Sequence, residues 1–439
     1  MSQTAPIDPR NPLDPVRLAR GKFLAMAGTY SLGVFNDNFF KQAACLLAIA
    51  GGRAELQGYA GGLFALPFIL FAAPAGFLAD RFAKRHVVIA AKALELAAMI
   101  CGAIGICIGN WPLMLIMVFT MGLQATIFGP ALNGSIPELY PASYVLKANS
   151  VLKTATTVAI LLGIIFACVA LGQKQVSWHG IAAGRLIVAG GVLAMSALGL
   201  LLSLWVPSRP PANPAAKFPW TGPADTVRAL AGLRTDRLLA GTVILDAYVW
   251  FAAALDVFII NRLGMSQFQM DESNISFLQV PLLAGVAAGG LACGRLATSD
   301  RWHRVLAPAA LAMGSALLLI ALVPLLPEHI GISAAALALS KIYPQIIASC
   351  LLLFFTGAAG GILLVPLEAF IQARPPADRK GQIIAAANCT AFIGILLAGL
   401  AFNVLDRFMR PTAAFGVLGG LTMLAGLVVC IRPLRDKDL

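Results

Sequence analysis

Long apolar runs alternate with short polar connections along almost the whole chain. A bilayer core of about 30 Å is crossed by about 20 helical residues, and twelve runs are near that length. A segment in lipid must satisfy its own backbone hydrogen bonds, as an α-helix does. The pattern therefore predicts an all-α membrane protein with twelve transmembrane helices at residues 21–50, 58–79, 87–108, 112–133, 150–171, 181–206, 238–261, 275–297, 305–326, 346–371, 383–404 and 412–431.

One polar, proline-rich stretch interrupts this pattern between the sixth and the seventh predicted helix. It is too polar to cross a bilayer, and its amphipathic part at 225–234 suits the membrane surface. We therefore expect two six-helix bundles with cytoplasmic connections: an N-terminal tail at 1–20, a first bundle at 21–206, a linker at 207–236, a second bundle at 237–433 and a C-terminal tail at 434–439.

Composition and charge agree with a membrane location. The chain is 59% hydrophobic and 12% charged, about half the charge of a soluble domain. Most of its 32 Lys and Arg residues fall on the side of the N-terminus, which predicts that both termini are cytoplasmic. Anionic lipid then accounts for the net charge of +12 without nucleic acid. Residues 1–20 lack the apolar core of a signal peptide, so we expect direct insertion of the first helix.

Enzyme chemistry finds little support in the sequence. None of the four His residues is followed five positions later by the Asp that an acyltransferase commonly needs, and the chain has no G-x-S-x-G or phosphate-binding glycine loop. The eight Cys lie in apolar segments without a C-x-x-C pair, so we interpret them as packing residues. We expect no catalytic residues, no metal site and no cofactor.

The two halves show a loose internal similarity. Pro130 and Glu138 near the end of the fourth predicted helix match Pro366 and Glu368 near the end of the tenth. Paired interruptions of this kind are typical of transporters built from repeats. The pattern predicts that proline interrupts both helices and that Glu138 and Glu368 serve gating or binding.

A charged loop carries the first family resemblance. The run Gly76–Arg85 reads GFLADRFAKR and resembles the G-x-L-A-D-R-x-G-R-K signature of the major facilitator superfamily, with Ala83 in place of the second Gly. The resemblance implies the fold of that superfamily and alternating access by rocking of the two bundles. It assigns gating roles to Gly76, for close helix approach, and to Asp80, Arg81, Lys84 and Arg85.

The first predicted helix carries a sharper resemblance. The run Asn36–Lys41 reads NDNFFK and is similar to the lysophospholipid transporters of the same superfamily, as are Glu138 with its neighbours and Lys147–Ser150. The resemblance implies a monomeric flippase of the bacterial inner membrane that moves lysophosphatidylethanolamine-like lipids inward. It also implies a separate acyltransferase that re-acylates the lipid, and it assigns a gating role to Asn149.

Ionisable residues at membrane depth are functional candidates because they are costly there. Asp37 and Lys41 lie four residues apart on one helical face and are expected to neutralise each other, with Asn36 and Asn38 beside them. A phosphate calls for Lys41 and an ethanolamine amine for Asp37. The alternative is a structural ion pair that locks helices together.

The roles of three further acidic residues and of one pair of charged residues remain open. Asp246 joins Glu368 as a candidate for substrate binding, and either Asp246 or Asp256 suits a coupling ion, H+ or Na+. Asp256 alternatively pairs with Arg262 near the outer mouth. Lys92 and Glu95, three residues apart, are interpreted as structural, with Lys92 reaching the interface.

Two other functions compete with lipid transport. A proton-coupled exporter of drugs or hydrophobic compounds shares the fold, the Gly76–Arg85 run and a buried acid. An importer of a small polar solute is the second alternative. The Asn36–Lys41 run favours the lysophospholipid hypothesis.

Overall fold

The computed structural model describes residues 14–139, 142–206, 210–211, 213–215, 217–233, 236–296, 302–328, 330–331, 341–374 and 380–431. Contacts divide the chain into two compact units: unit 1 holds Met1–Ala43 and Leu70–Gly222, and unit 2 holds Ala44–Ile69 and Pro223–Leu439. Residues 44–69 thus group with unit 2 although they precede the linker. The bundle limits expected from the sequence stay a prediction.

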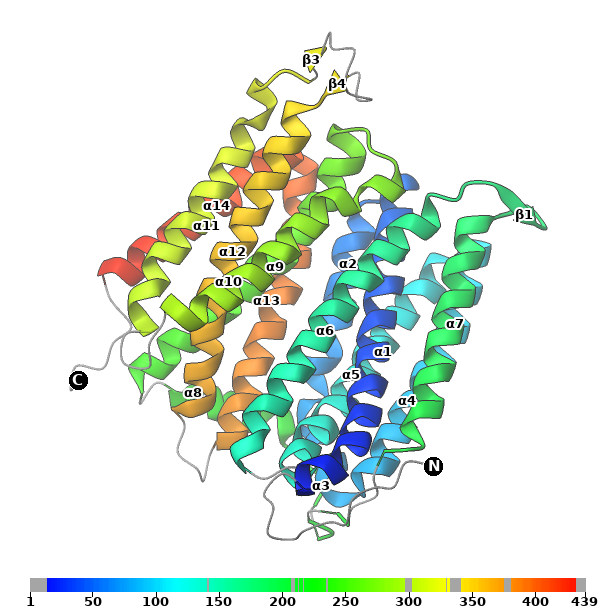
Figure 1. Ribbon diagram of the computed structural model, residues 1–439, viewed down its shortest axis with the longest axis vertical. Coiled ribbons are helices and arrows are strands. Elements are labelled where there is room, and N and C mark those ends of the chain that lie inside the picture. The colour runs from blue at the N-terminus through cyan, green and yellow to red at the C-terminus, as the bar shows by residue number, and fades with distance from the viewer. Residues whose placement is uncertain are drawn as a thin grey trace. The chain divides into compact units, whose positions relative to one another are not determined.

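Unit 1 is helical apart from one small hairpin (Figure 1). Its antiparallel strands β1 and β2 pair next to the start of α7. Helix α1 (Asp14–Ala50) belongs to unit 1 up to Ala43. The other elements of unit 1 are α3 (Ala72–Arg81), α4 (Lys84–Ile108), α5 (Trp111–Leu139), α6 (Ala142–Leu171), β1 (Val176–Trp178), β2 (Ile181–Ala182) and α7 (Ala183–Ser203).

Unit 2 has a similar composition of long helices and one small hairpin. Short π and 3₁₀ turns lie at Leu263–Gln267, Glu272–Asn274, Trp302–Val305 and Val323–Leu325. The remaining elements are α2 (Glu55–Leu70), α8 (Gly222–Gly232), α9 (Arg237–Arg262), α10 (Ser276–Leu296), α11 (Leu306–Leu322), β3 (Ile330–Gly331), β4 (Lys341–Ile342), α12 (Pro344–Ala373), α13 (Lys380–Phe408) and α14 (Pro411–Ile431).

Every predicted transmembrane segment coincides with a helix or, for residues 58–79, with the pair α2 and α3. Among the described residues, nine helices are long and apolar enough to cross a membrane, and the bent pair makes ten. The limits differ by several residues at a number of helix ends: α1 begins at Asp14 rather than at residue 21, α5 continues to Leu139 rather than to residue 133, and α6 begins at Ala142 rather than at residue 150. Residues 181–182 form β2 rather than the start of α7.

The expected interruptions by Pro130 and Pro366 are wrong. Both residues lie inside continuous helices, α5 and α12. Transmembrane helices tolerate proline because neighbouring helices and local adjustments satisfy the freed backbone groups. The sharp break occurs instead between α2 and α3, which are bent by 53°. Pro74 has no N–H for the carbonyl four residues earlier and clashes with it, and Phe71 leaves the helical conformation at φ −114° and ψ 11°.

Helix α1 lies among the other helices of unit 1, in backbone-level contact with α6. A Cβ added to Gly163 of α6 would lie 2.6 Å from the carbonyl oxygen of Phe35. A Cβ on Gly191 of α7 would lie 2.7 Å from the ring of Phe39. Small residues of this kind permit close helix packing in lipid. They fix the polar face of α1 against the surrounding helices.

Helices α10 and α12 of unit 2 also pack backbone to backbone, through small residues that permit close approach in lipid. A Cβ added to Gly289 would overlap the carbonyl group of Ala358, and one added to Gly361 would overlap the carbonyl oxygen of Val286. A Cβ on the adjacent Gly290 would meet only Val365 Cγ2, at 3.6 Å.

We therefore predict that Gly289→Ala lowers the free energy of unfolding by about 1–3 kcal/mol, the usual cost of overpacking. Gly290→Ala is the matched control, since its methyl group would lie at an ordinary van der Waals distance from the Val365 side chain. Melting temperatures of both variants in the same detergent check the prediction. Equal melting temperatures would contradict the tight α10–α12 contact.

Asp236 caps the start of α9 and joins it to the end of α12. Its Oδ1 accepts hydrogen bonds from the N–H groups of Leu238 and Leu239, both at 3.1 Å. Its Oδ2 pairs with Arg374 Nε at 3.0 Å. Partial burial raises the pKa of this carboxyl, but the hydrogen bonds and the charge of Arg374 outweigh burial and hold the pKa below its ordinary value.

Because the folded-state pKa is depressed, this carboxyl stabilises the fold above about pH 4 and loses that effect as the pH falls through the folded-state pKa. Asp236→Ala is expected to cost about 1 kcal/mol at neutral pH, and the difference from wild type should shrink in acid. Thermal unfolding of both proteins at neutral and acid pH measures this. A difference that does not change with pH would count against the assigned role.

Candidate functional site

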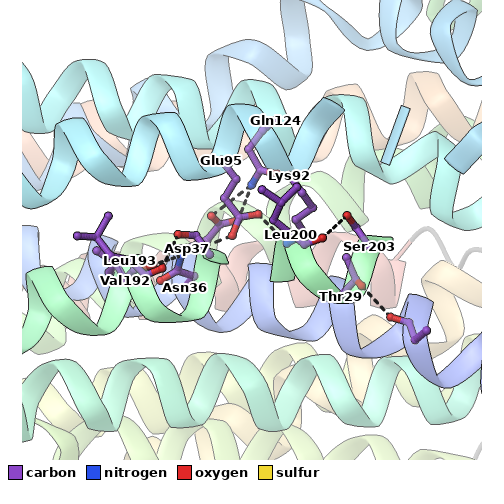
Figure 2. Close-up of polar contacts among 12 residues, drawn as sticks. Thr29, Asn36, Asp37, Lys92, Glu95, Gln124, Val192, Leu193, Leu200 and Ser203 are labelled. Carbon is purple, nitrogen blue, oxygen red and sulfur yellow. Dashed lines mark hydrogen bonds and ion pairs between the residues drawn. The ribbon is translucent and has the colours of Figure 1, made fainter. Parts of the chain in front are cut away.

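A buried polar network surrounds the middle of α1 in unit 1. Figure 2 shows Asn36 and Asp37 of α1 facing side chains from α4 and α5 and the backbone of α7. Asn36 is 0% and Asp37 6% exposed. Polar and charged side chains are costly inside membrane-spanning helices, so this network is a candidate functional site.

An ion pair on α4 forms one half of this network. Lys92 Nζ lies 2.6 Å from Glu95 Oε2, and the two side chains are 2% and 0% exposed. Asn36 Nδ2 donates to the Val192 carbonyl at 3.1 Å and to Glu95 Oε1 at 3.5 Å. Lys92 also sits 5.5 Å from the centre of the Phe128 ring. The prediction that Lys92 reaches the interface is therefore wrong: its ammonium is held inside by Glu95.

Two glycines make room for the Lys92 side chain. A Cβ on Gly33 of α1 would lie 2.6 Å from Lys92 Nζ, and one on Gly199 of α7 would lie 3.4 Å from it. A larger residue at position 33 would collide with the ammonium group. The α1–α4 contact is thus shaped around this charge.

Asp37 forms the other half of the network. Gln124 Nε2 of α5 lies 3.4 Å from each of its carboxylate oxygens. The charges that act on this carboxylate are those of Glu95, Lys92 and Lys41. The fully enclosed part therefore holds two carboxylates and one ammonium group, and half-buried Lys41 supplies the second ammonium.

The Asp37 carboxylate has Gln124 of α5 as a hydrogen-bond donor, and Lys41 acts on it through its charge. The expected neutralisation of Asp37 by Lys41 stays a prediction. Asn38 donates to the Val34 carbonyl of its own helix at 2.8 Å, so it faces away from the network.

Asp246 and Glu368 belong to unit 2, on α9 and α12. Asp246 is buried, at 5% exposure, and Glu368 is half-buried. Their participation in substrate binding stays a prediction. The alternative pairing of Asp256 with Arg262 is wrong, because Arg262 Nε donates to Asp406 at 2.8 Å.

The Gly76–Arg85 run spans the end of α3 and the start of α4. Phe82 and Ala83 between them are extended, at φ −111° and −57°, so this turn does not require a glycine. A Cβ on Gly76 would meet nothing within 4 Å, so the expected close helix approach there is wrong.

The charged residues of this run lie around the short connection. Arg85 donates to the Leu204 carbonyl at 2.8 Å, and the Arg81 guanidinium lies 5.8 Å from the Phe77 ring. The Asp80 carbonyl accepts from Asn213 at 2.9 Å, and Lys84 is nearly buried at 9%. The side chains of Glu138 and Asn149 lie outside the described residues, so their gating roles stay predictions.

Sequence reasoning missed Gln124 and undervalued Lys92 and Glu95. Gln124 is 2% exposed and lies in the middle of a largely apolar helix. An amide in the middle of a membrane span was the available signal, since a buried polar group needs a partner. Its partner, Asp37, lies 87 residues away in sequence, which no local spacing reveals.

Long apolar helices that enclose a charged network define the class of this protein as an α-helical membrane transporter. The family model of the Major Facilitator Superfamily matches residues 21–342. The chain belongs to this superfamily.

Curated relatives carry the name lysophospholipid transporter LplT. The protein from Enterobacter sp. (strain 638) is 26% identical over 414 residues, covering 92% of this chain and 93% of its own length. The protein from Klebsiella pneumoniae subsp. pneumoniae is 27% identical over 367 residues, covering 81% of each chain. A solved POT family transporter in complex with 5-aminolevulinic acid is 14% identical with a TM-score of 0.69, covering 94% of this chain and 96% of that one. This last likeness shows the fold alone.

Proposed function

We propose that this protein is a secondary transporter that moves lysophospholipids inward across the bacterial cytoplasmic membrane. One observation carries the proposal: the enclosed network of Asp37, Lys92 and Glu95, with Lys41 beside it, presents both signs of charge at membrane depth. A zwitterionic headgroup also carries one charge of each sign. The LplT relatives at 26% and 27% identity support the same substrate class.

The headgroup exchanges partners with the network. The ethanolamine ammonium binds the Asp37 carboxylate, whose hydrogen bonds from Gln124 are long, at 3.4 Å to each oxygen. The phosphate binds Lys41 and draws Lys92 from Glu95, since charge-assisted bonds to phosphate are strong. Because two acids and two ammonium groups meet a neutral zwitterion, binding leaves no net buried charge. The single acyl chain lies on apolar helix surface.

The transport cycle follows alternating access between the two sides of the membrane. The Gly76–Arg85 run serves as a conformational segment, together with Glu138 and Asn149. Both termini are cytoplasmic, and the protein acts as a monomer in the inner membrane. It performs no chemistry itself, so a separate acyltransferase consumes the imported lipid. A coupling ion, H+ or Na+, drives the cycle.

A binding experiment tests the substrate class directly. Purified protein is heated in detergent with lysophosphatidylethanolamine, with a lipophilic drug cation or with a sugar. We expect the lysophospholipid to raise the melting temperature in a concentration-dependent way, because a ligand that binds only the folded state stabilises it. Glycerophosphoethanolamine, which has the headgroup without the acyl chain, should stabilise less. Stabilisation by the drug cation or the sugar alone would favour the exporter or the polar-solute importer.

A further inference from the structure

Asp256 is a buried acid of unit 2 that the headgroup site does not use. It lies in α9, is 1% exposed, and its Oδ1 accepts no hydrogen bond from any residue that the structure describes. Its neighbours along the helix, Leu255, Phe258, Ile259 and Ile260, belong to an apolar cluster. An ionised carboxylate in such surroundings, without donors, is strongly disfavoured. The protonated acid is neutral and avoids this cost.

The other charged groups around α9 are engaged elsewhere or lie at helix ends. Asp406 of α13 pairs with Arg262, and Arg374 of α12 pairs with Asp236. Tyr248 interacts electrostatically with Asp256, and its hydroxyl is hydrogen-bonded to the Thr422 hydroxyl at 2.7 Å. The other charged residues on helices packed against α9 whose side chains the structure describes are Glu368 on α12 and Arg407 on α13. In the described part of the chain, none of these residues forms a hydrogen bond or ion pair with Asp256.

A cluster of three hydrogen-bonded amide side chains lies near the Arg262 end of α9, beyond Asp256. It consists of Gln57 of α2, Asn261 of α9 and Gln279 of α10, which are 0%, 0% and 1% exposed. Asn261 Nδ2 donates to Gln57 Oε1 at 2.6 Å, Gln57 Nε2 donates to the Phe258 carbonyl at 3.0 Å, and Gln279 donates to Asn261 Oδ1. Asn261 is five residues beyond Asp256, or about 7.5 Å along the helix axis.

The part of α2 that carries Gln57 is docked through glycines. A Cβ on Gly58 would lie 2.5 Å from the Gly399 carbonyl oxygen of α13, and one on Gly62 would lie 2.9 Å from Leu396. A Cβ on Gly61 would meet the ring of Phe258. These glycines bring α2 close enough to α9 for side chains of the two helices to form hydrogen bonds. The amide cluster therefore supplies specific bonds that hold α2 on α9, each worth about 0.5–1.5 kcal/mol net, and a conformational change can break them.

We propose that Asp256 is the proton-binding site of the transport cycle, and that the Gln57–Asn261–Gln279 cluster controls its access to the outer solution. While the cluster is closed, the carboxyl keeps its proton. When the cluster separates, water reaches Asp256 and the proton exchanges. Protonation from outside thus permits the outer end to close, which couples the cycle to a proton gradient. This inference rests on the proposed transport function and names its coupling ion.

The geometry favours a proton over Na+. A hard cation takes several oxygen ligands, whereas Asp256 Oδ1 has no polar partner in the described part of the chain. A proton needs no further ligand than the carboxylate itself.

Infrared spectroscopy of the purified protein tests proton binding without any substrate. We expect the carbonyl band of a protonated carboxylic acid at neutral pH, its loss in Asp256→Asn, and its return in Asp256→Glu, which keeps a carboxyl group. Asp271→Asn, which removes an exposed acid, is the matched control and should keep the band. A cross-link between Cys residues at positions 57 and 261 should slow exchange of this proton with D2O. A band unchanged in Asp256→Asn, or exchange unaffected by the cross-link, would overturn the proposal.

Uptake in vesicles tests the coupling. An inward proton gradient should raise lysophosphatidylethanolamine uptake by wild type several-fold and have no effect on Asp256→Asn; a Na+ gradient should affect neither. A proton effect that persists in Asp256→Asn, or a response to Na+, would overturn the assignment. If wild type transports no lysophospholipid, the proposed function fails, and the infrared band alone then decides whether Asp256 holds the proton.

Discussion

Asp37→Asn is expected to reduce lysophosphatidylethanolamine uptake by about 10- to 100-fold while the protein remains folded. The substitution keeps the size of the side chain and a carbonyl oxygen for Gln124, but it removes the charge that binds the ammonium group. A hydrogen bond to a charged group is worth about 1.5–3 kcal/mol, which corresponds to this range of affinity. Initial rates at several substrate concentrations in reconstituted vesicles measure the change.

Ser203→Ala provides a control in the same part of unit 1. The Ser203 hydroxyl is buried and donates to the Leu200 carbonyl of its own helix at 2.6 Å, so its removal does not touch Asp37 (Figure 2). We expect uptake by this variant to match that of wild type. Wild-type uptake by Asp37→Asn would contradict the assigned site.

The second large effect concerns the Lys92–Glu95 pair. Lys92→Met and Glu95→Gln are each expected to lower the free energy of unfolding by about 3–5 kcal/mol, because each leaves a buried charge without its partner. The double variant removes both charges of the pair together and should recover most of this stability. Denaturation of all four proteins in one detergent yields the coupling energy.

The same double-mutant cycle also distinguishes a role of the pair in substrate binding from a purely structural role. If the pair takes part in headgroup binding, the double variant is stable but transports poorly, since Lys92 no longer reaches the phosphate. A stable double variant with wild-type uptake would reduce the pair to a structural role. Single variants as stable as wild type would contradict the burial of the two charges.

The fold was predictable because lipid imposes a strong rule on sequence. Each membrane-spanning helix needs about 20 apolar residues, and the predicted segments fall on the helices accordingly. The bend between α2 and α3 was not predicted, although Pro74 is visible in the sequence. The same residue type at Pro130 and Pro366 leaves α5 and α12 continuous. Proline marks where a helix can bend, and the surrounding helices decide whether it does.

The candidate site was only partly predictable. The Asn36–Lys41 run pointed to the stretch of α1 around which the buried polar network lies, because charged residues in an apolar helix are rare. Its partners come from α4, α5 and α7, and which helices adjoin α1 depends on packing across long sequence separations. Spacing suggested an Asp37–Lys41 pair, whereas the buried ion pair is Lys92–Glu95 at 2.6 Å.

The most direct test of the central claim is uptake by purified wild-type protein reconstituted in vesicles. Labelled lysophosphatidylethanolamine is compared with labelled glycerophosphoethanolamine and with a diacyl lipid of the same headgroup, and protein-free vesicles set the background. We predict saturable uptake of the lysophospholipid, with little uptake of the molecule without an acyl chain or of the one with two. Uptake no greater than in protein-free vesicles, by protein that is folded in the same vesicles, would contradict lysophospholipid transport.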